Sequence, residues 1–261
     1  MIDKKILDNL AKTSSGVGIP LQSLEKELRL FEFIPKFFNL IEENGIPAVL
    51  YGGTALNKGF FREKQRFSKD LDIYLPSRNF KDNCSKISKL LQDLEGYKIE
   101  KMHQSKDTAV WSAGYGEKKW ENLLIEVRRY PVKGKMHKLE LHSLLEFAGL
   151  PILPVHVPSY SFEYILAGKI ISLSRRAIGK DIYDVNMGLR LKPDIHELKS
   201  FIKAMAKKDA AFIISEAVYW LDKVDIGKQS DIAELQDSVP IAYREDVRSM
   251  INSLKYELKK L

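Results

Sequence analysis

A glycine pair followed by two aspartates in a strand pattern constrains this chain more than any other feature of its sequence. The apolar segment 46–51 predicts a short buried strand that ends at Gly52–Gly53. In segment 70–75, polar and apolar residues alternate with period two, which predicts a second strand. Because successive side chains on a strand point to opposite faces, we expect Asp70 and Asp72 to project from one face.

Two carboxylates on one strand face predict a site for a hard divalent cation. Their backbones are about 6 to 7 Å apart, so both side chains can converge on one or two ions. Mg²⁺, with Mn²⁺ as the alternative, takes oxygen ligands and shares them between carboxylates and substrate phosphates. Glu126 lies in the middle of an apolar strand pattern and is the candidate third metal ligand. A charge on the exposed face of a half-covered strand is the alternative for Glu126.

The glycine pair and the residues before the acidic strand predict a phosphate site. Glycine lets the backbone approach a phosphate closely, and a helix that begins at Thr54 would point its free N–H groups at the anion. Arg66 and Ser68 add a guanidinium and a hydroxyl donor. A tight turn is the ordinary role of a glycine pair, but the neighbouring acidic strand favours the phosphate interpretation.

The remaining patterns predict an α/β (α+β) fold. The first 45 residues have helical spacing of apolar residues, and strands are expected at about 46–51, 70–75, 97–103, 108–115 and 122–130. These form a mixed sheet of about five strands. Prolines between 151 and 158 indicate an irregular connector, after which the pattern is helical with no convincing strand. We therefore expect one domain over 1–155 and a helical domain over 156–261 that contributes to the active-site cleft.

Charge and composition bear on partners and location. The 42 Lys and Arg exceed the 35 Asp and Glu, and the net charge of +7 favours polyanions such as RNA, DNA or nucleotides. A basic cluster after the fifth strand is a candidate RNA contact, with a solvated loop as the alternative: Arg128, Arg129, Lys133, Lys135 and Lys138. No apolar run has the length of a membrane span and no secretory signal is present, so a cytoplasmic protein without membrane contact is expected. The five histidines lack the spacing of metal ligands, so the sequence does not predict a zinc site.

Further motifs lie downstream of the acidic strand. The chain contains, in order, the runs Gly-Gly-Thr-Ala-Leu and Arg-x-Ser-x-Asp-Leu-Asp. These are followed by Lys169, Arg176 and the segment 180–184, Lys-Asp-Ile-Tyr-Asp. In this order the motifs resemble the AbiEii/AbiGii-type nucleotidyltransferase toxins, including the MenT group, within the polymerase-β-like nucleotidyltransferase superfamily. The resemblance covers about residues 46–190. It implies that the 1–155 domain is a nucleotidyltransferase domain.

The resemblance also implies roles for particular residues. It assigns catalysis to Asp70, Asp72, Lys169 and Asp181, and metal binding to Asp70 and Asp72. Together with the phosphate-site argument, the nucleotide-binding set is Gly52, Gly53, Thr54, Arg66, Ser68, Lys169 and Arg176. An ordinary amphipathic helix with an ion pair is the alternative for Lys169 and Asp181.

The reaction implied is nucleotidyl transfer from a nucleoside triphosphate to an acceptor hydroxyl. RNA is the foremost acceptor, at the 3′ end of transfer RNA, and the implied role is that of a toxin with a cognate antitoxin protein. Transfer of a nucleotidyl or phosphoryl group to a protein or a small molecule is the enzymatic alternative. A nucleotide- or RNA-binding module without turnover is the other.

Overall fold

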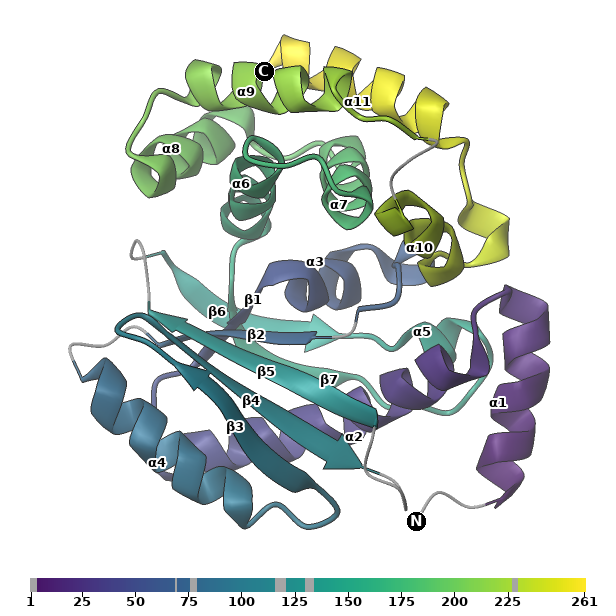
Figure 1. Cartoon of the computed structure of the whole chain (residues 1–261), viewed down its shortest axis with the longest axis vertical. Coiled ribbons are helices and arrows are strands. Elements are labelled where there is room, and N and C mark those ends of the chain that lie inside the picture. The colour runs from purple at the N-terminus through teal and green to yellow at the C-terminus, as the bar shows by residue number, and fades with distance from the viewer. Residues whose placement is uncertain (1–3, 69, 76–78, 116–120, 130–133, 227–229) are drawn as a thin grey trace.

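The structure is a computed structural model that describes residues 4–68, 70–75, 79–115, 121–129, 134–226 and 230–261. Lys133 of the predicted basic cluster lies outside these residues. The elements form three layers: helices beneath a twisted sheet, the sheet itself, and a group of helices above it (Figure 1). None of the described helices is both long and apolar enough to cross a membrane.

Helices and strands are mixed along the chain as far as β7, and the described elements after β7 are all helical. The strands are β1 (Val49–Tyr51), β2 (Asp70–Leu75), β3 (Lys98–Gln104), β4 (Thr108–Tyr115), β5 (Glu121–Arg129), β6 (Met136–Leu141) and β7 (Val155–Tyr160). The helices up to the last strand are α1 (Lys4–Val17), α2 (Leu21–Glu43), α3 (Gly52–Phe60), α4 (Phe80–Gln92) and α5 (Leu144–Phe147). The later helices are α6 (Phe162–Leu173), α7 (Gly179–Arg190), α8 (Ile195–Ala206), α9 (Ala210–Asp222), α10 (Ser230–Ser238) and α11 (Val247–Lys260).

The sheet is mixed and has the strand order β3-β4-β5-β2-β1-β7-β6. Strand β2 pairs in parallel with β5, and β1 pairs in parallel with β7, whereas the other neighbours are antiparallel. The predicted α/β fold is confirmed, but the sheet has seven described strands instead of about five. The helical pattern expected from residue 159 onward begins at α6, after β7 ends at Tyr160.

The two missed strands have weak sequence signals. Strand β7 contains Pro158, and the prolines of this segment predict an irregular connector instead of a strand. The strand tolerates it because only one residue pair, Leu50 with Ser159, joins β7 to β1. Strand β6 lies at the edge of the sheet and is mostly exposed, so its residues lack a clear apolar alternation. The predicted domain boundary at residue 156 falls within β7, and the division into two domains stays a prediction.

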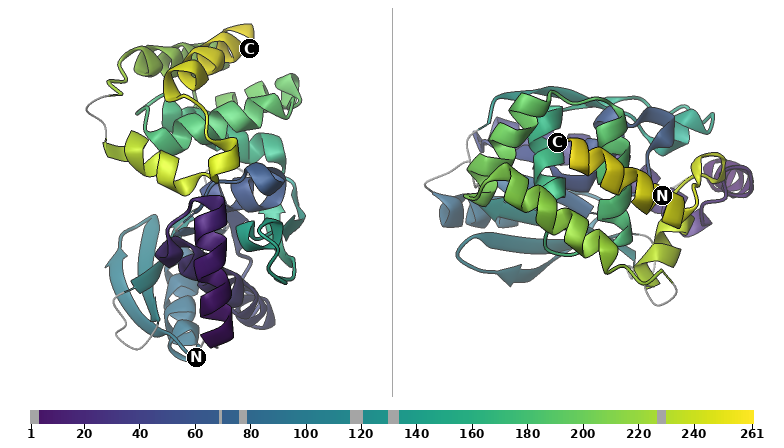
Figure 2. Two further views of the ribbon diagram at one scale, coloured as in Figure 1. Left: turned by 90° about the vertical axis from the view of Figure 1, so that its right-hand side faces the viewer. Right: turned by 90° about the horizontal axis from the view of Figure 1, so that it is seen from above.

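The period-two pattern of β2 determines which side chains enter the core. Leu71, Ile73 and Leu75 are fully buried, whereas Asp70 and Asp72 are half-buried on the opposite face. That opposite face lies toward α6 and α7, while α2 and α4 lie beneath the sheet (Figures 1 and 2). The alternation predicted from sequence is thus observed in the structure. It leaves both carboxylates in the space between the sheet and the upper helices.

A buried ion pair attaches the N-terminal helix α2 to α3. The Nζ atom of Lys58 lies 2.6 Å from Oε1 of Glu27, and both side chains are fully buried. Lys58 also donates to Oε1 of Gln65 at 2.7 Å, and Glu27 accepts from the backbone N–H of Leu144 at 3.0 Å. Burial lowers the pKa of Lys58, while Glu27 opposes that change. Each charge is therefore stable in the interior only because its partner is present.

We expect Lys58→Ala to lower the free energy of unfolding by at least about 3 kcal/mol, because it leaves the Glu27 carboxylate buried without a countercharge. Urea denaturation monitored by circular dichroism measures the effect. The double variant Glu27→Leu/Lys58→Met removes both charges and should recover much of the loss. A loss below about 1 kcal/mol for Lys58→Ala, the range of exposed ion pairs, would contradict the expectation.

Candidate active site

The turn between β1 and α3 places backbone directly against a carboxylate of β2. Helix α3 begins at Gly52, two residues before the predicted start at Thr54. Gly52 has a φ of +75°, and a Cβ atom there would lie 2.0 Å from Oδ2 of Asp72. Only glycine satisfies both the backbone angle and the close approach. The turn therefore sets the position of the Asp72 side chain.

We expect Gly52→Ala to reduce the nucleotidyl transfer that the sequence motifs imply at least about 100-fold, because the new methyl group must displace the Asp72 carboxylate. Rates of label transfer from a nucleoside triphosphate measure the effect. Gly45→Ala is the matched control, since Gly45 also has a positive φ of +63° but has open space around its Cβ position. If both variants lose the same activity, backbone strain rather than the displaced carboxylate explains the loss.

Three polar side chains surround the bare backbone of Gly53, the second residue of α3. A Cβ atom at Gly53 would lie 2.9 Å from Nη2 of Arg66, 3.4 Å from Nζ of Lys169 and 3.6 Å from Oγ of Ser68. The first turn of α3 also has unpaired N–H groups and a positive dipole end. This arrangement suits an anion. Thr54, in contrast, is fully buried, and its hydroxyl lies 2.8 Å from Ser68 Oγ, so it positions that serine.

A buried carboxylate that sequence reasoning did not select holds this cationic site together. Asp184 of α7 accepts from Nε and Nη2 of Arg66 at 2.9 and 2.7 Å and lies 2.8 Å from Nζ of Lys169. Asn57 of α3 donates to it at 2.8 Å. Burial alone raises the pKa of Asp184, but Arg66 and Lys169 outweigh burial and lower the pKa to about 2. The guanidinium of Arg66 is thus bound mainly within the protein, with Nη1 donating to the Phe67 carbonyl.

A second acid of α7 completes the predicted group around Lys169. Lys169 is the only lysine of the largely apolar helix α6, and its Nζ lies 3.2 Å from Oδ1 of Asp181. The other oxygen of Asp181 is buried and has no hydrogen-bond partner among the described residues. The Nε of Arg176 lies 3.6 Å from that oxygen, and the Arg176 side chain is 61% exposed. The structure therefore brings Lys169, Arg176 and Asp181 together.

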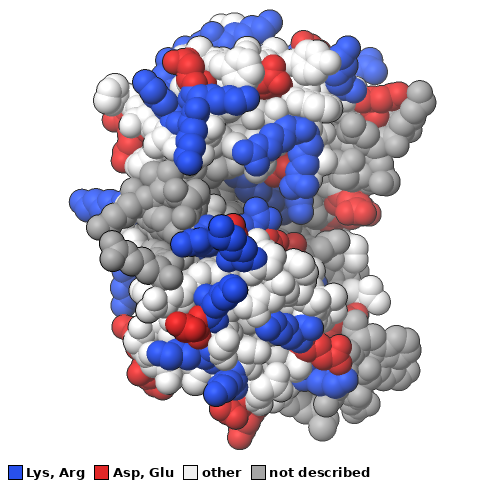
Figure 3. All heavy atoms as spheres, turned by 60° about the vertical axis from the view of Figure 1, so that its left-hand side comes forward, with Lys and Arg blue, Asp and Glu red and all other residues white. Residues whose placement is uncertain are grey.

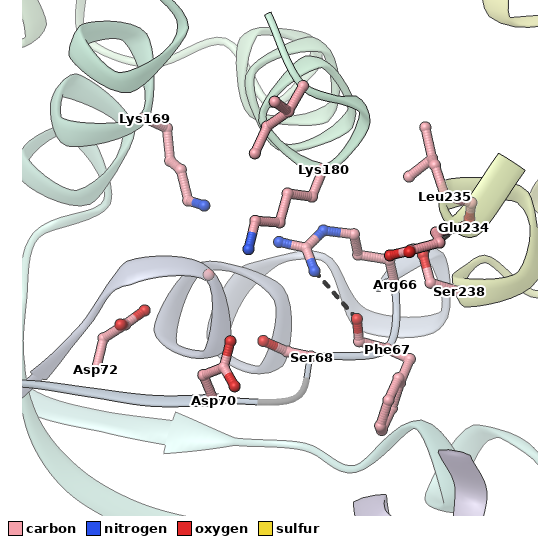
Figure 4. Close-up of a pocket in the computed structure, with 12 residues that line it drawn as sticks. Arg66, Phe67, Ser68, Asp70, Asp72, Lys169, Lys180, Glu234, Leu235 and Ser238 are labelled. Atoms are coloured by element: carbon pink, nitrogen blue, oxygen red, sulfur yellow. Dashed lines mark hydrogen bonds between the residues drawn. The ribbon is translucent and has the colours of Figure 1, made fainter. Parts of the chain in front are cut away.

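Two cavities meet at the carboxylates of β2. The first chamber, of about 280 Å³, is lined by Gly53, Arg66, Phe67, Ser68, Asp70, Asp72, Lys169, Ile178, Lys180, Glu234, Leu235 and Ser238. Figure 4 shows Lys169, Lys180 and Arg66 on one side of this chamber and Asp70, Asp72 and Ser68 on the other. The second chamber, of about 220 Å³, shares Asp70, Asp72, Lys169 and Lys180 with the first and adds Tyr51, Tyr74, Glu126, Arg128, Arg176 and Asp181, among others. Nearly all predicted site residues thus line one or both chambers.

The electrostatics of Asp72 suit a cation. Burial, together with the charges of Glu126 and Asp70, raises its pKa to about 6, although Lys169 opposes the change. A divalent cation between Asp70 and Asp72 would relieve this repulsion, and phosphate oxygens or water would complete its ligands. The described residues contain no group of three His, Cys, Asp or Glu that could hold a metal by themselves. Glu126 pairs in register with Asp72 but forms an ion pair with Arg128, so its role as third ligand stays a prediction.

The architecture is that of known nucleotidyltransferases. MenT4, a nucleotidyltransferase toxin from Mycobacterium tuberculosis H37Rv, superposes with a TM-score of 0.66 at 15% identity, covering 97% of this chain and 90% of its own. A protein from H. pylori assigned as a nucleotidyltransferase superposes with a TM-score of 0.56 at 15% identity, covering 93% and 95%. Identities this low concern the fold alone. Comparison with curated proteins gave no match.

Family membership follows from the sequence match rather than from these superpositions. Residues 40–260 match the family model described as nucleotidyl transferase AbiEii toxin of type IV toxin–antitoxin systems. The chain belongs to the AbiEii family and is a nucleotidyltransferase. The resemblance drawn from the motifs is confirmed. The family also assigns the chain the role of toxin.

Proposed function

We propose that the protein uses Mg²⁺ to transfer a nucleotide from a nucleoside triphosphate to a hydroxyl of RNA, with the 3′ end of transfer RNA as the foremost acceptor. The observation that carries the proposal is the first chamber, where two carboxylates face Lys169, Lys180 and the start of α3. In a triphosphate with a bound cation, the cation suits the two carboxylates and the phosphates suit the lysines and the start of α3. A cognate antitoxin is the protein partner.

The residues of the first chamber divide the work of holding the triphosphate. The N–H groups at the start of α3 and the hydroxyl of Ser68 donate to phosphate oxygens. Lys169 neutralises phosphate charge, and the buried carboxylates of Asp181 and Asp184 keep its side chain in place. Asp70 and Asp72 hold the cation, which when bound offsets the negative charge that develops at the α-phosphate.

Asp181 is placed to act on the acceptor. Asp181 lines the second chamber, and its buried Oδ2 has no hydrogen-bond partner among the described residues. In the transfer, the acceptor oxygen forms a bond to the α-phosphorus, the bond from that phosphorus to pyrophosphate breaks, and the hydroxyl loses its proton. A carboxylate oxygen next to the attacking hydroxyl orients it and accepts this proton.

The surface around the chambers favours a polyanionic acceptor. Lysine and arginine side chains lie on both sides of the hollow between the sheet and the upper helices, and acidic atoms lie inside it (Figure 3). The chain has a net charge of +7. Basic residues on both rims attract a phosphate backbone while the acids inside attract the cation.

The test is label transfer from each of the four α-³²P-labelled nucleoside triphosphates to total RNA in the presence of Mg²⁺. We expect label in RNA of transfer-RNA size, and no label after EDTA treatment. Mass spectrometry of the protein and of small products monitors the other acceptors. Label found only on protein or on a small molecule, or transfer unaffected by EDTA, would refute the proposal.

The pH dependence of the reaction should report the ionisation of Asp72. Its pKa of about 6 means that the carboxylate is protonated, and unable to bind a cation, as pH falls below 6. We expect kcat/KM to fall about tenfold per pH unit below that value and to level off about one unit above it. Because a bound cation stabilises the ionised form, higher Mg²⁺ concentrations should move the midpoint to lower pH. A midpoint near 4 at low Mg²⁺ would contradict the expectation.

A further inference from the structure

The second chamber has an aromatic wall made by two adjacent strands. Tyr51 of β1 and Tyr74 of β2 stack with ring centroids 3.5 Å apart and planes within 6° of each other. Both tyrosines line the chamber. Proteins that bind single-stranded RNA stack its unpaired bases on aromatic side chains. Double-stranded RNA rarely uses such a surface.

The sheet register places this wall beside the reacting groups. Tyr51 is directly opposite Asp72, and Asp72 is in turn opposite Glu126. Tyr74 is opposite Arg128 in the next row. Residues opposite each other across neighbouring strands share a face of the sheet. A base against the tyrosines would therefore have its sugar close to Asp72.

Arginines lie on both sides of the same chamber. Arg128 comes from the sheet and is 54% exposed, whereas Arg176 comes from the segment between α6 and α7 and is 61% exposed. Each forms an ion pair with an acid of the chamber, Glu126 and Asp181 respectively. Guanidinium groups at this exposure remain able to contact a phosphate from solvent.

Two of the groups assigned to the triphosphate line only the first chamber, and a third, Lys169, lines both. Gly53 and Ser68 line only the first chamber, and the second instead contains the acids Glu126 and Asp181. Those acids oppose a triphosphate but suit hydroxyl groups, which donate to carboxylates. The chambers share Asp70 and Asp72, so groups bound in each meet at the carboxylates.

We propose that the second chamber binds the 3′-terminal nucleotide of a single-stranded RNA acceptor, with its base against the Tyr51–Tyr74 pair and its backbone phosphate at Arg128 and Arg176. The inference rests on the proposed function and adds where the acceptor binds. The terminal hydroxyl of the RNA acceptor lies next to Asp72 and Asp181. The triphosphate occupies the first chamber.

The test uses a short single-stranded RNA that carries 2-aminopurine at its 3′ end, because stacking quenches the fluorescence of this base. We expect the wild-type protein to quench it and Tyr74→Leu not to. In transfer assays, Tyr74→Leu should raise the KM for RNA about 10-fold or more, the range for loss of one stacked base, and leave the KM for the triphosphate unchanged. Tyr74→Phe should retain quenching and KM, as should the control Tyr256→Leu, which alters an exposed tyrosine of α11.

A second variant keeps the test valid if Tyr74→Leu fails to fold. Arg128→Gln should raise the KM for RNA and leave the KM for the triphosphate unchanged. The slope of log KM for RNA against log salt concentration should decrease by about one, as for the loss of one phosphate contact. A rise in the triphosphate KM, or an unchanged KM for RNA in both variants, would overturn the inference alone. Absence of transfer by the wild-type protein would overturn the proposed function and this inference with it.

Discussion

Asp72→Asn is expected to reduce nucleotidyl transfer about a thousandfold without unfolding the protein. The variant keeps the size of the side chain but removes the charge that holds the cation. Loss of one metal ligand removes roughly 4 kcal/mol of transition-state stabilisation, and each 1.36 kcal/mol corresponds to a factor of ten in rate. Single-turnover label transfer at saturating triphosphate measures the decrease.

The folded state should tolerate this substitution. Burial and the charges of Glu126 and Asp70 raise the pKa of Asp72 to about 6, so its ionised form is disfavoured in the absence of a cation. A neutral asparagine removes that repulsion, and we expect the melting temperature without metal to be unchanged or higher. Mg²⁺ with a triphosphate should stabilise the wild type and have little effect on the variant.

Asp93→Asn provides a control, because Asp93 is exposed at the end of α4, beneath the sheet. It should retain full activity and the full stabilisation by ligand. Activity of Asp72→Asn within tenfold of the wild type would show that Asp72 does not hold the cation. A large drop in its melting temperature would instead indicate a structural role.

The β2 carboxylates were predictable because local patterns determine where they lie. The alternation over 70–75 can be recognised from six consecutive residues. The turn at Gly52 can be recognised because it directly follows the apolar strand pattern of 46–51. Strands β6 and β7 were missed because a proline and an exposed edge hide the same kind of pattern. Local signals thus succeed for β2, where the alternation is uninterrupted, and fail where a proline or an exposed edge obscures it.

The charge network behind the site was not predictable in the same way. Asp184 was part of a recognised motif, and its i, i+3 spacing from Asp181 puts both acids on one face of α7. Its partner Arg66 is 118 positions away, and Arg66 was expected to contact phosphate directly. Lys58 similarly resembles a surface lysine in sequence, yet Glu27 stabilises it in the core from another helix. Pairings between distant segments have no signature in a single sequence.

Asp184→Asn is expected to lower the free energy of unfolding by about 3 to 5 kcal/mol and to abolish most activity. The substitution leaves the buried guanidinium of Arg66 without its anion and removes one of the two carboxylates that hold Lys169. Lys169 then loses its fixed position over the first chamber. Urea denaturation and transfer assays measure the two effects.

The pH dependence of stability identifies the cause. The pKa of Asp184 is lowered to about 2 in the folded protein, so its ion pairs stabilise the fold above the unfolded-state pKa of about 4 and are lost as pH falls from 4 toward 2. For a shift of this size the wild type should lose about 2 kcal/mol over that interval through Asp184. The Asp184→Asn variant should lack this component.

Asp181→Asn is the matched comparison, because Asp181 lies three residues away on the same face of α7 and also contacts Lys169. Lys169 and Arg66 both keep Asp184 in that variant, so the stability loss should be about 1 kcal/mol, as for one hydrogen bond. Its activity should nevertheless fall strongly, because the Asp181 carboxylate, which lines the second chamber, is lost as a proton acceptor. Equal stability losses in the two variants would mean that Asp184 is not the residue that holds the site together.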